Sequence, residues 1–183
     1  IETFGSVDGP GVRFIVFMQG CPMRCQYCHN PDSWKMRTGE ELTADELLDK
    51  ALRYRTYWGD KGGITVSGGE ALMQMEFVTE LFEKAHAMGV TTCLDTSAQP
   101  FTREEPWFGD FAKLMAVTDT VLLDIKHIDD EAHRRLTRFG NANILDCARY
   151  LSDIGKPVWI RHVLVPGITD DEASLVRLHD FLC

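Results

Sequence analysis

The 183-residue sequence predicts an α/β fold with a parallel sheet. Five short apolar runs alternate with helical patterns, which is the order of parallel strands joined by right-handed crossovers. The runs are rich in β-branched residues and apolar on both faces, as in a sheet covered by helices. No repeat, linker or low-complexity tract is visible, so we expect one domain over residues 1–183.

The strands are expected where the apolar runs occur. They are predicted near Val12–Met18, Gly63–Ser67, Thr91–Thr96, Thr120–Lys126 and Val158–Val165. Each run is short enough for a strand.

The helices are predicted from apolar stripes and end signals. Thr43 and Glu46 form a capping-box pattern, and Thr169 with Glu172 forms a second one before the last helix. Gly89 predicts a left-handed helix end. The stripes, which we interpret as core, are Leu47, Leu48, Ala51 and Leu52; Phe77, Val78, Leu81, Phe82, Ala85 and Met88; Trp107, Phe108, Phe111, Leu114 and Met115; Ile144, Leu145, Ala148 and Leu151; and Leu175, Val176 and Leu178.

Composition excludes several classes of protein. The formal net charge of -9 argues against a nucleic-acid binder, and the apolar runs are too short to span a membrane. No signal peptide is visible, and the cysteines cluster instead of forming a scattered disulfide pattern, which favours a reducing cytoplasm. Because the chain starts at Ile1 and stops at Cys183 within a helical pattern, we expect truncation at both ends.

Three of the six cysteines lie in one short segment, residues 19–31, which we call the cysteine loop. Cys21, Cys25 and Cys28 follow the first predicted strand at positions i, i+4 and i+7. Their sulfurs can converge only if the backbone folds back, which Gly20 permits. Cys93, Cys147 and Cys183 are interpreted as unrelated to this loop, the first two as core residues.

Three clustered thiolates are compatible with three kinds of site. Iron–sulfur clusters normally have four cysteine ligands, so three predict a cluster with one open iron. A zinc site that adds His29 and a redox pair of Cys25 and Cys28 are the alternatives. Tyr27, an aromatic residue just before the last cysteine, favours the cluster.

At this point the sequence resembles a known family. The CxxxCxxC pattern with its aromatic residue resembles the signature of radical S-adenosylmethionine (SAM) enzymes. Residues 6–14 and 28–34 resemble the activases of glycyl radical enzymes, and residues 67–71 and 159–167 resemble those acting on pyruvate formate-lyase. The resemblance covers essentially the whole chain. It implies a partial (β/α)6 TIM-like barrel, with five of its six strands in this chain and the sixth beyond Cys183.

The resemblance also implies an activity. SAM would be cleaved reductively at a 4Fe-4S cluster, and the 5′-deoxyadenosyl radical would take a hydrogen from a glycine of pyruvate formate-lyase, in anaerobic glucose metabolism. Flavodoxin or ferredoxin would supply the electron. Both are acidic, so we expect a basic patch of Arg24, Lys35 and Arg37, on a chain that acts as a monomer.

Polar residues at the ends of the predicted strands are candidates for the site, since parallel α/β folds collect their sites there. A buried strand-end charge needs a partner, so an ion pair of Lys126 with Asp124 or Asp95 is the structural alternative. The resemblance implies that the backbone of Gly68, Gly69 and Glu70 receives the SAM ammonium. It implies the same ammonium contact for Asp95 and a carboxylate contact for Lys126. Further implied SAM contacts are Tyr27, Cys28, His29, Thr96, Asp124, Ile125 and Val163.

The remaining implied roles concern catalysis, a cation and the partner. Arg161 is expected in the catalytic pocket with the three cysteines, although a solvated edge charge is the alternative. A monovalent cation is expected at Asp95, Thr96, Asp124 and the backbone of Leu122. The residues expected to receive the partner's glycine loop are Asp8, Gly9, Pro10, Gly11, Arg13 and His29.

Three other functions remain open from the sequence. An activase of anaerobic ribonucleotide reductase would share the cysteine loop but is expected to have GGD where this chain has Gly68, Gly69 and Glu70. Activases of other glycyl radical enzymes often insert extra cysteines after the first motif, and none occurs between Cys28 and Cys93. A zinc-stabilised module without catalysis is the third.

Overall fold

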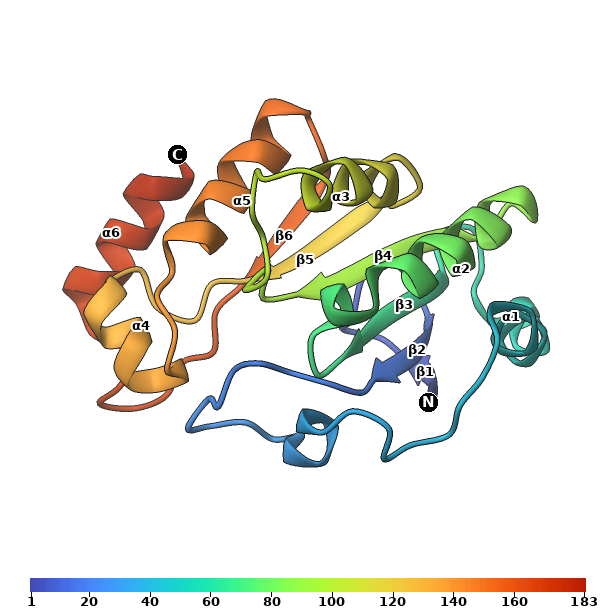
Figure 1. The fold of residues 1–183 in the computed structure, drawn as a ribbon, viewed down its shortest axis with the longest axis horizontal. Coiled ribbons are helices and arrows are strands. Elements are labelled where there is room, and N and C mark those ends of the chain that lie inside the picture. The colour runs from blue at the N-terminus through green and yellow to red at the C-terminus, as the bar shows by residue number, and fades with distance from the viewer.

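The computed structural model describes residues 1–183 and contains one sheet of six strands in the order β1-β2-β3-β4-β5-β6 (Figure 1). The five predicted strands are confirmed and pair in parallel. They are β2 (Arg13–Met18), β3 (Gly63–Gly68), β4 (Thr91–Thr96), β5 (Thr120–Asp124) and β6 (Val158–Arg161). Because the strands follow one another in chain order, each crossover moves one position along the sheet, and all their carboxyl ends meet at one rim.

One strand was not predicted. β1 (Glu2–Gly5) pairs with β2 in the antiparallel direction, with Glu2 opposite Ile15 and Gly5 opposite Arg13. It covers the edge that β2 would otherwise leave open. β1 has only four residues and no apolar run, so the periodicity that revealed the other strands is absent.

The helices connect and cover the sheet. In Figure 1, α2, α3 and α5 lie along one side of the strands, and the cysteine loop runs below the sheet towards α4. The α-helices are α1 (Ala44–Leu52), α2 (Met75–Ala87), α3 (Trp107–Ala116), α4 (Asp130–Thr137), α5 (Ala142–Asp153) and α6 (Glu172–Leu182). Three single turns of 3₁₀ helix are η1 (Pro31–Trp34), η2 (Arg55–Tyr57) and η3 (Ala71–Gln74).

The helix ends test the predicted caps. The capping box at Thr43 and Glu46 is present, and Gly89 after α2 has a left-handed φ of 66°. The capping box predicted at Thr169 is wrong. The Thr169 hydroxyl is buried, where it donates to Val163 O and accepts from Val165 N, while Asp171 caps α6 by accepting from Ser174 N at 2.9 Å. α4 was not predicted at all.

The core lies between the sheet and the helices. Its largest fully buried apolar side chains include Phe14 of β2, Leu94 of β4, Phe82 of α2 and Phe111 of α3. Cys93 and Cys147 are fully buried, which confirms their interpretation as core residues. No helix has the length and apolar character needed to cross a membrane.

Candidate active site

A cavity of about 160 Å³ lies at the carboxyl ends of the parallel strands. The cysteine loop and residues at the ends of β3, β4, β5 and β6 line it together. Most of the predicted site residues are among its walls: Asp8, Cys21, Cys25, Tyr27, Cys28, His29, Gly68, Gly69, Asp95, Thr96, Asp124, Lys126, Arg161 and Val163. Met23, Ser67 and Ser97 also line it and were not predicted, although Ser67 lies at a predicted strand end.

The cysteine loop is closed by backbone hydrogen bonds. Gly20 N donates to Ser33 O at 2.8 Å, Cys21 N to Trp34 O at 3.2 Å, and Cys28 N to Cys25 O at 3.1 Å. These bonds fold the chain back after β2, as the spacing predicted, so that the three half-buried thiols line one cavity. All three are free.

The arrangement of the thiols does not support a site for a single metal ion. No three His, Cys, Asp or Glu side chains of the structure are grouped closely enough to hold one metal ion, so the Cys3His zinc alternative finds no support. Burial raises the pKa of Cys21 to about 11 and also raises that of Cys25. A metal would have to displace those protons.

Two buried polar atoms beside the thiols lack a partner. They are Tyr27 Oη and Asp124 Oδ1. A buried polar atom without a hydrogen bond is costly, so their presence in the cavity wall fits a polar ligand there.

The two glycines at the end of β3 lie in close contact with the backbone at the start of the cysteine loop. A Cβ on Gly68, whose φ is 109°, would come within 2.2 Å of Met18 N, and one on Gly69 within 2.3 Å of Gly20 O. Glu70 N donates to the same Gly20 O at 2.7 Å. The sequence suggested bare backbone for a ligand; the structure shows that the close packing of the two segments already requires both glycines.

The Glu70 side chain does not line the cavity, while the predicted SAM contact, which was assigned to its backbone, stays a prediction. The side chain is 1% exposed and turns towards the end of β4. Its carboxylate accepts from Leu72 N at 3.1 Å, Ser97 N at 3.0 Å, Ser97 Oγ at 2.6 Å and the Thr96 hydroxyl. The Glu70 side chain therefore fixes the segment that follows Asp95 and would act on a ligand only through that segment.

The charged strand-end residues form two pairs. Asp95 Oδ2 accepts from Arg161 Nη1 at 2.9 Å and from Ser67 Oγ at 2.7 Å, and Lys126 Nζ lies 2.5 Å from Asp124 Oδ2. Of the two ion pairs considered for Lys126, the structure contains the one with Asp124. Although burial opposes it, the attraction of Asp124 raises the pKa of Lys126 above its usual range.

The pKa of Asp95 gives a testable pH dependence. Burial raises it from 3.8 to about 6, against the attraction of Arg161. Between these values the folded protein binds more protons than the unfolded chain, so this residue adds stability as the pH falls from about 6 to about 4. We expect the free energy of unfolding of the unaltered protein to gain on that of Asp95→Asn over this range, measured by urea unfolding. A difference that stays constant with pH would contradict the raised pKa.

Among the residues predicted to receive a partner loop, Asp8 lines the cavity and its Oδ1 lies 3.5 Å from Arg161 Nη1. Arg13 is wrongly placed in that group, because its side chain is only 1% exposed and is covered by residues 8–11. Its guanidinium donates to Thr65 Oγ1 at 3.0 Å and to Pro10 O at 3.3 Å, and Thr65 Oγ1 donates to Asp8 O at 2.7 Å. Arg13 thus fixes residues 8–10 through its hydrogen bond to Pro10 and, by way of Thr65, to Asp8.

The other predicted residues lie outside the cavity lining. Gly9 and Gly11 have φ values of 123° and 72° and shape the turn before β2 with Pro10. Leu122 and Ile125 are fully buried, and Ile125 N donates to Arg161 O at 3.0 Å. A SAM contact through the Ile125 side chain is therefore excluded, while the cation site stays a prediction.

A family model described as the radical SAM superfamily matches residues 15–179. The chain belongs to the radical SAM superfamily. It is 57% identical to a pyruvate formate-lyase-activating enzyme of Streptococcus mutans over 99% of this chain and 70% of that protein. It is 51% identical to one of Listeria monocytogenes over 100% of this chain and 74% of that protein.

A solved structure of Streptococcus suis SuiB bound to S-adenosylmethionine shares the fold. It matches with a TM-score of 0.70 at 16% identity, over 93% of this chain and 37% of that one. The predicted fold class, a partial TIM-like barrel of the radical SAM type, is confirmed. Membership of this superfamily implies a 4Fe-4S cluster and SAM as cofactors.

Proposed function

We propose that this chain activates pyruvate formate-lyase under anaerobic conditions by generating a glycyl radical on it. Relatives that match essentially the whole chain at 50–57% identity are pyruvate formate-lyase-activating enzymes. The observation that most supports the proposal is the single cavity lined by three free thiols and by the strand-end residues. In it, a 4Fe-4S cluster when bound would supply the electron that cleaves SAM and so starts hydrogen abstraction from glycine.

Some residues of the cavity would bind the cluster and SAM, and others would exclude water. Cys21, Cys25 and Cys28 would hold the cluster. Asp95 and Lys126, each already held in an ion pair, would orient the charged ends of SAM across the rim of the sheet. Met23 and Phe17 give the cavity part of its apolar wall, which limits the water that could quench a reactive species.

Asp8 and Arg161 would control the entrance for the partner's loop. Arg161 Nη1 bridges Asp95 Oδ2 and Asp8 Oδ1, so the segment before β2 is connected to the end of β4 through one guanidinium. A glycine loop that enters beside Asp8 would therefore be positioned relative to the same residues that orient SAM. His29, an exposed side chain on the cavity wall, would contact that loop.

The direct test is an anaerobic assay with the cluster reconstituted, an inorganic reductant, SAM and purified pyruvate formate-lyase. We expect the EPR signal of a glycyl radical on the partner. Anaerobic ribonucleotide reductase, assayed in parallel, is expected to remain unmodified. A radical on the reductase alone would assign the chain to the other activase class, and a colourless zinc-containing protein would contradict the enzyme altogether.

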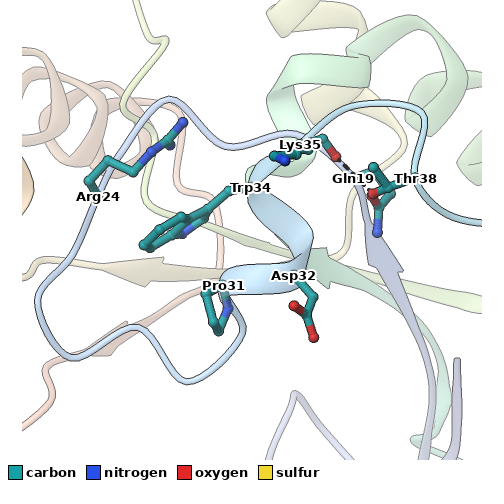
Figure 2. Close-up of a pocket in the computed structure, with 7 residues that line it drawn as sticks. All are labelled: Gln19, Arg24, Pro31, Asp32, Trp34, Lys35 and Thr38. Atoms are coloured by element: carbon teal, nitrogen blue, oxygen red, sulfur yellow. Dashed lines mark hydrogen bonds between the residues drawn. The ribbon is translucent and has the colours of Figure 1, made fainter.

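A second surface hollow supports a docking site for the electron donor. It has a volume of about 470 Å³ and is lined by residues of the cysteine loop and of the segment that follows it (Figure 2). Arg24 lies over the Trp34 ring at 4.9 Å from its centroid, and Arg24 Nη1 donates to Cys21 O at 2.7 Å. Trp34 lines both this hollow and the thiol-lined cavity, so it forms part of the wall between them. The hollow is lined by Gln19, Arg24, Pro31, Asp32, Trp34, Lys35 and Thr38.

This geometry supports a small acidic electron carrier, flavodoxin or ferredoxin, as the donor. Two of the three residues of the predicted basic patch, Arg24 and Lys35, line the hollow, and Arg37 follows nearby in the chain. Cationic side chains raise the rate at which an acidic partner associates, in spite of the net charge of -9. We also propose that the chain acts as a monomer in the cytoplasm; sedimentation of the purified protein tests the first part.

Lys35→Glu is expected to slow cluster reduction by the protein donor about tenfold at low salt, because it reverses a charge that attracts the donor. Stopped-flow bleaching of the cluster measures this rate. Lys61→Glu is the matched control, since exposed Lys61 precedes β3 at the opposite end of the sheet. Dithionite should reduce both variants equally fast. An equal donor rate in both variants would exclude this surface as the docking site.

A further inference from the structure

The cysteine loop is bound to the last turn of α4. Arg24 N donates to Thr137 O at 3.1 Å and Gln26 N to Leu136 O at 3.1 Å, while Gln26 Nε2 donates to Arg135 O at 3.0 Å. The last carbonyl groups of a helix have no partner within the helix. Here the loop supplies three donors to three consecutive carbonyls, so an element distant in the sequence holds the stretch between Cys21 and Cys28.

The acceptor side of this contact is itself rigid. The Thr137 hydroxyl, fully buried, donates to His133 O at 2.8 Å and accepts from Phe139 N at 3.1 Å. His133 Nδ1 lies 2.6 Å from Phe139 O, and Arg138 has a left-handed φ of 75° that ends the helix. The turn therefore presents its carbonyls to the loop in one fixed arrangement.

The contact with α4 determines which hydrogen bonds the backbone amides of the loop can make. An N–H group that donates to a cysteine sulfur stabilises the more negative, reduced state of an iron–sulfur cluster and so raises its reduction potential. The amides of Arg24 and Gln26 flank Cys25 on both sides, next to the amide of Cys25 itself, which already donates to the Cys25 sulfur. Both are already bound to α4, which leaves them unable to donate to sulfur.

We propose that Gln26 and the last turn of α4 are positioning elements that keep the Arg24 and Gln26 amides away from the cysteine sulfurs and so hold the cluster at a low potential. This inference rests on the proposed function, because reductive cleavage of a sulfonium requires a strongly reducing cluster. Gln26 acts through the loop backbone and contacts neither cofactor nor substrate. No role follows for it from the cysteine pattern itself, since it is an exposed residue between two ligands.

The test uses Gln26→Met in the full chain with the cluster reconstituted. Because Gln26 is exposed, the substitution removes one donor at similar size without disturbing the core. We expect severalfold faster hydrogen exchange at the Arg24 and Gln26 amides and an upward shift of the midpoint potential in a redox titration followed by EPR. Gln26→Arg retains a donor for Arg135 O and should restore the exchange protection of the unaltered protein.

Two results would overturn the inference. One is unchanged exchange at the two amides in Gln26→Met. The other is faster exchange with an unchanged potential, which would make the contact structural only. The proposed function is judged separately, by whether the unaltered protein installs a glycyl radical with dithionite as reductant. Radical formation together with either overturning result leaves the function standing and removes only the role of α4.

Discussion

Cys25→Ser is expected to abolish both cluster binding and glycyl radical formation, reducing the radical yield to background. Cys25 is the second of the three thiols that line the cavity, and burial raises its pKa, so a bound metal has to displace its proton. A serine hydroxyl is a poor substitute for a thiolate ligand, and the two remaining cysteines cannot hold a cube that already lacks its fourth ligand.

The measurements are iron and sulfide content, visible absorbance and the EPR signal of the reduced protein. Cys183→Ser is the matched control, because Cys183 is exposed and lies outside the cavity. Metal analysis of the same samples also tests the zinc alternative. A Cys25→Ser protein with a full complement of iron would show that the cluster, if present, is held elsewhere.

Glu70→Ala is expected to lower the free energy of unfolding by about 3 kcal/mol, because it leaves buried donors without a partner. The Glu70 carboxylate binds the backbone N–H groups of Leu72 and Ser97 and the Ser97 hydroxyl, all near the end of β4. We also expect weaker SAM binding, since this network fixes the residues next to Asp95.

Urea unfolding of the full chain without cofactors measures the stability, and calorimetry of the reconstituted protein measures SAM binding. The control is Glu83→Ala on α2, where an exposed carboxylate is removed and a change within about 0.5 kcal/mol is expected. Equal unfolding midpoints for the two variants would show that the buried network does not stabilise the strand end.

Much of the fold was predictable because its apolar runs are long enough to reveal their period. The five parallel strands and the stripes of α1, α2, α3 and α5 follow directly from that periodicity. α4 escaped because Asp130–Thr137 is largely charged, and it is folded by capping and by contacts with distant segments. The start of α6 was misplaced because Thr169 and Asp171 both have side chains suited to capping, and only the packing of Thr169 distinguishes them.

The sequence predicted which residues meet at the candidate site better than it predicted the ion pairs between them. Parallel strands bring their carboxyl ends together, so Asp95, Asp124 and Lys126 were expected to meet. The sequence does not say which way a side chain turns, and this is why Arg13 was assigned to a surface that it does not reach. The pairing of Asp95 with Arg161 and of Asp124 with Lys126 likewise depends on tertiary geometry, which no local pattern encodes.

The crossing of Gly68 and Gly69 over the backbone of Met18 and Gly20 changes how this motif can be used as a diagnostic. A substitution at either glycine would push two segments of main chain apart before it met any bound molecule. Loss of activity in such a variant would therefore report a displaced loop and would say little about ligand contacts. In any relative that has a larger residue in place of Gly69, the two backbone segments must lie further apart. The presence of both glycines therefore indicates that the two segments are in close contact.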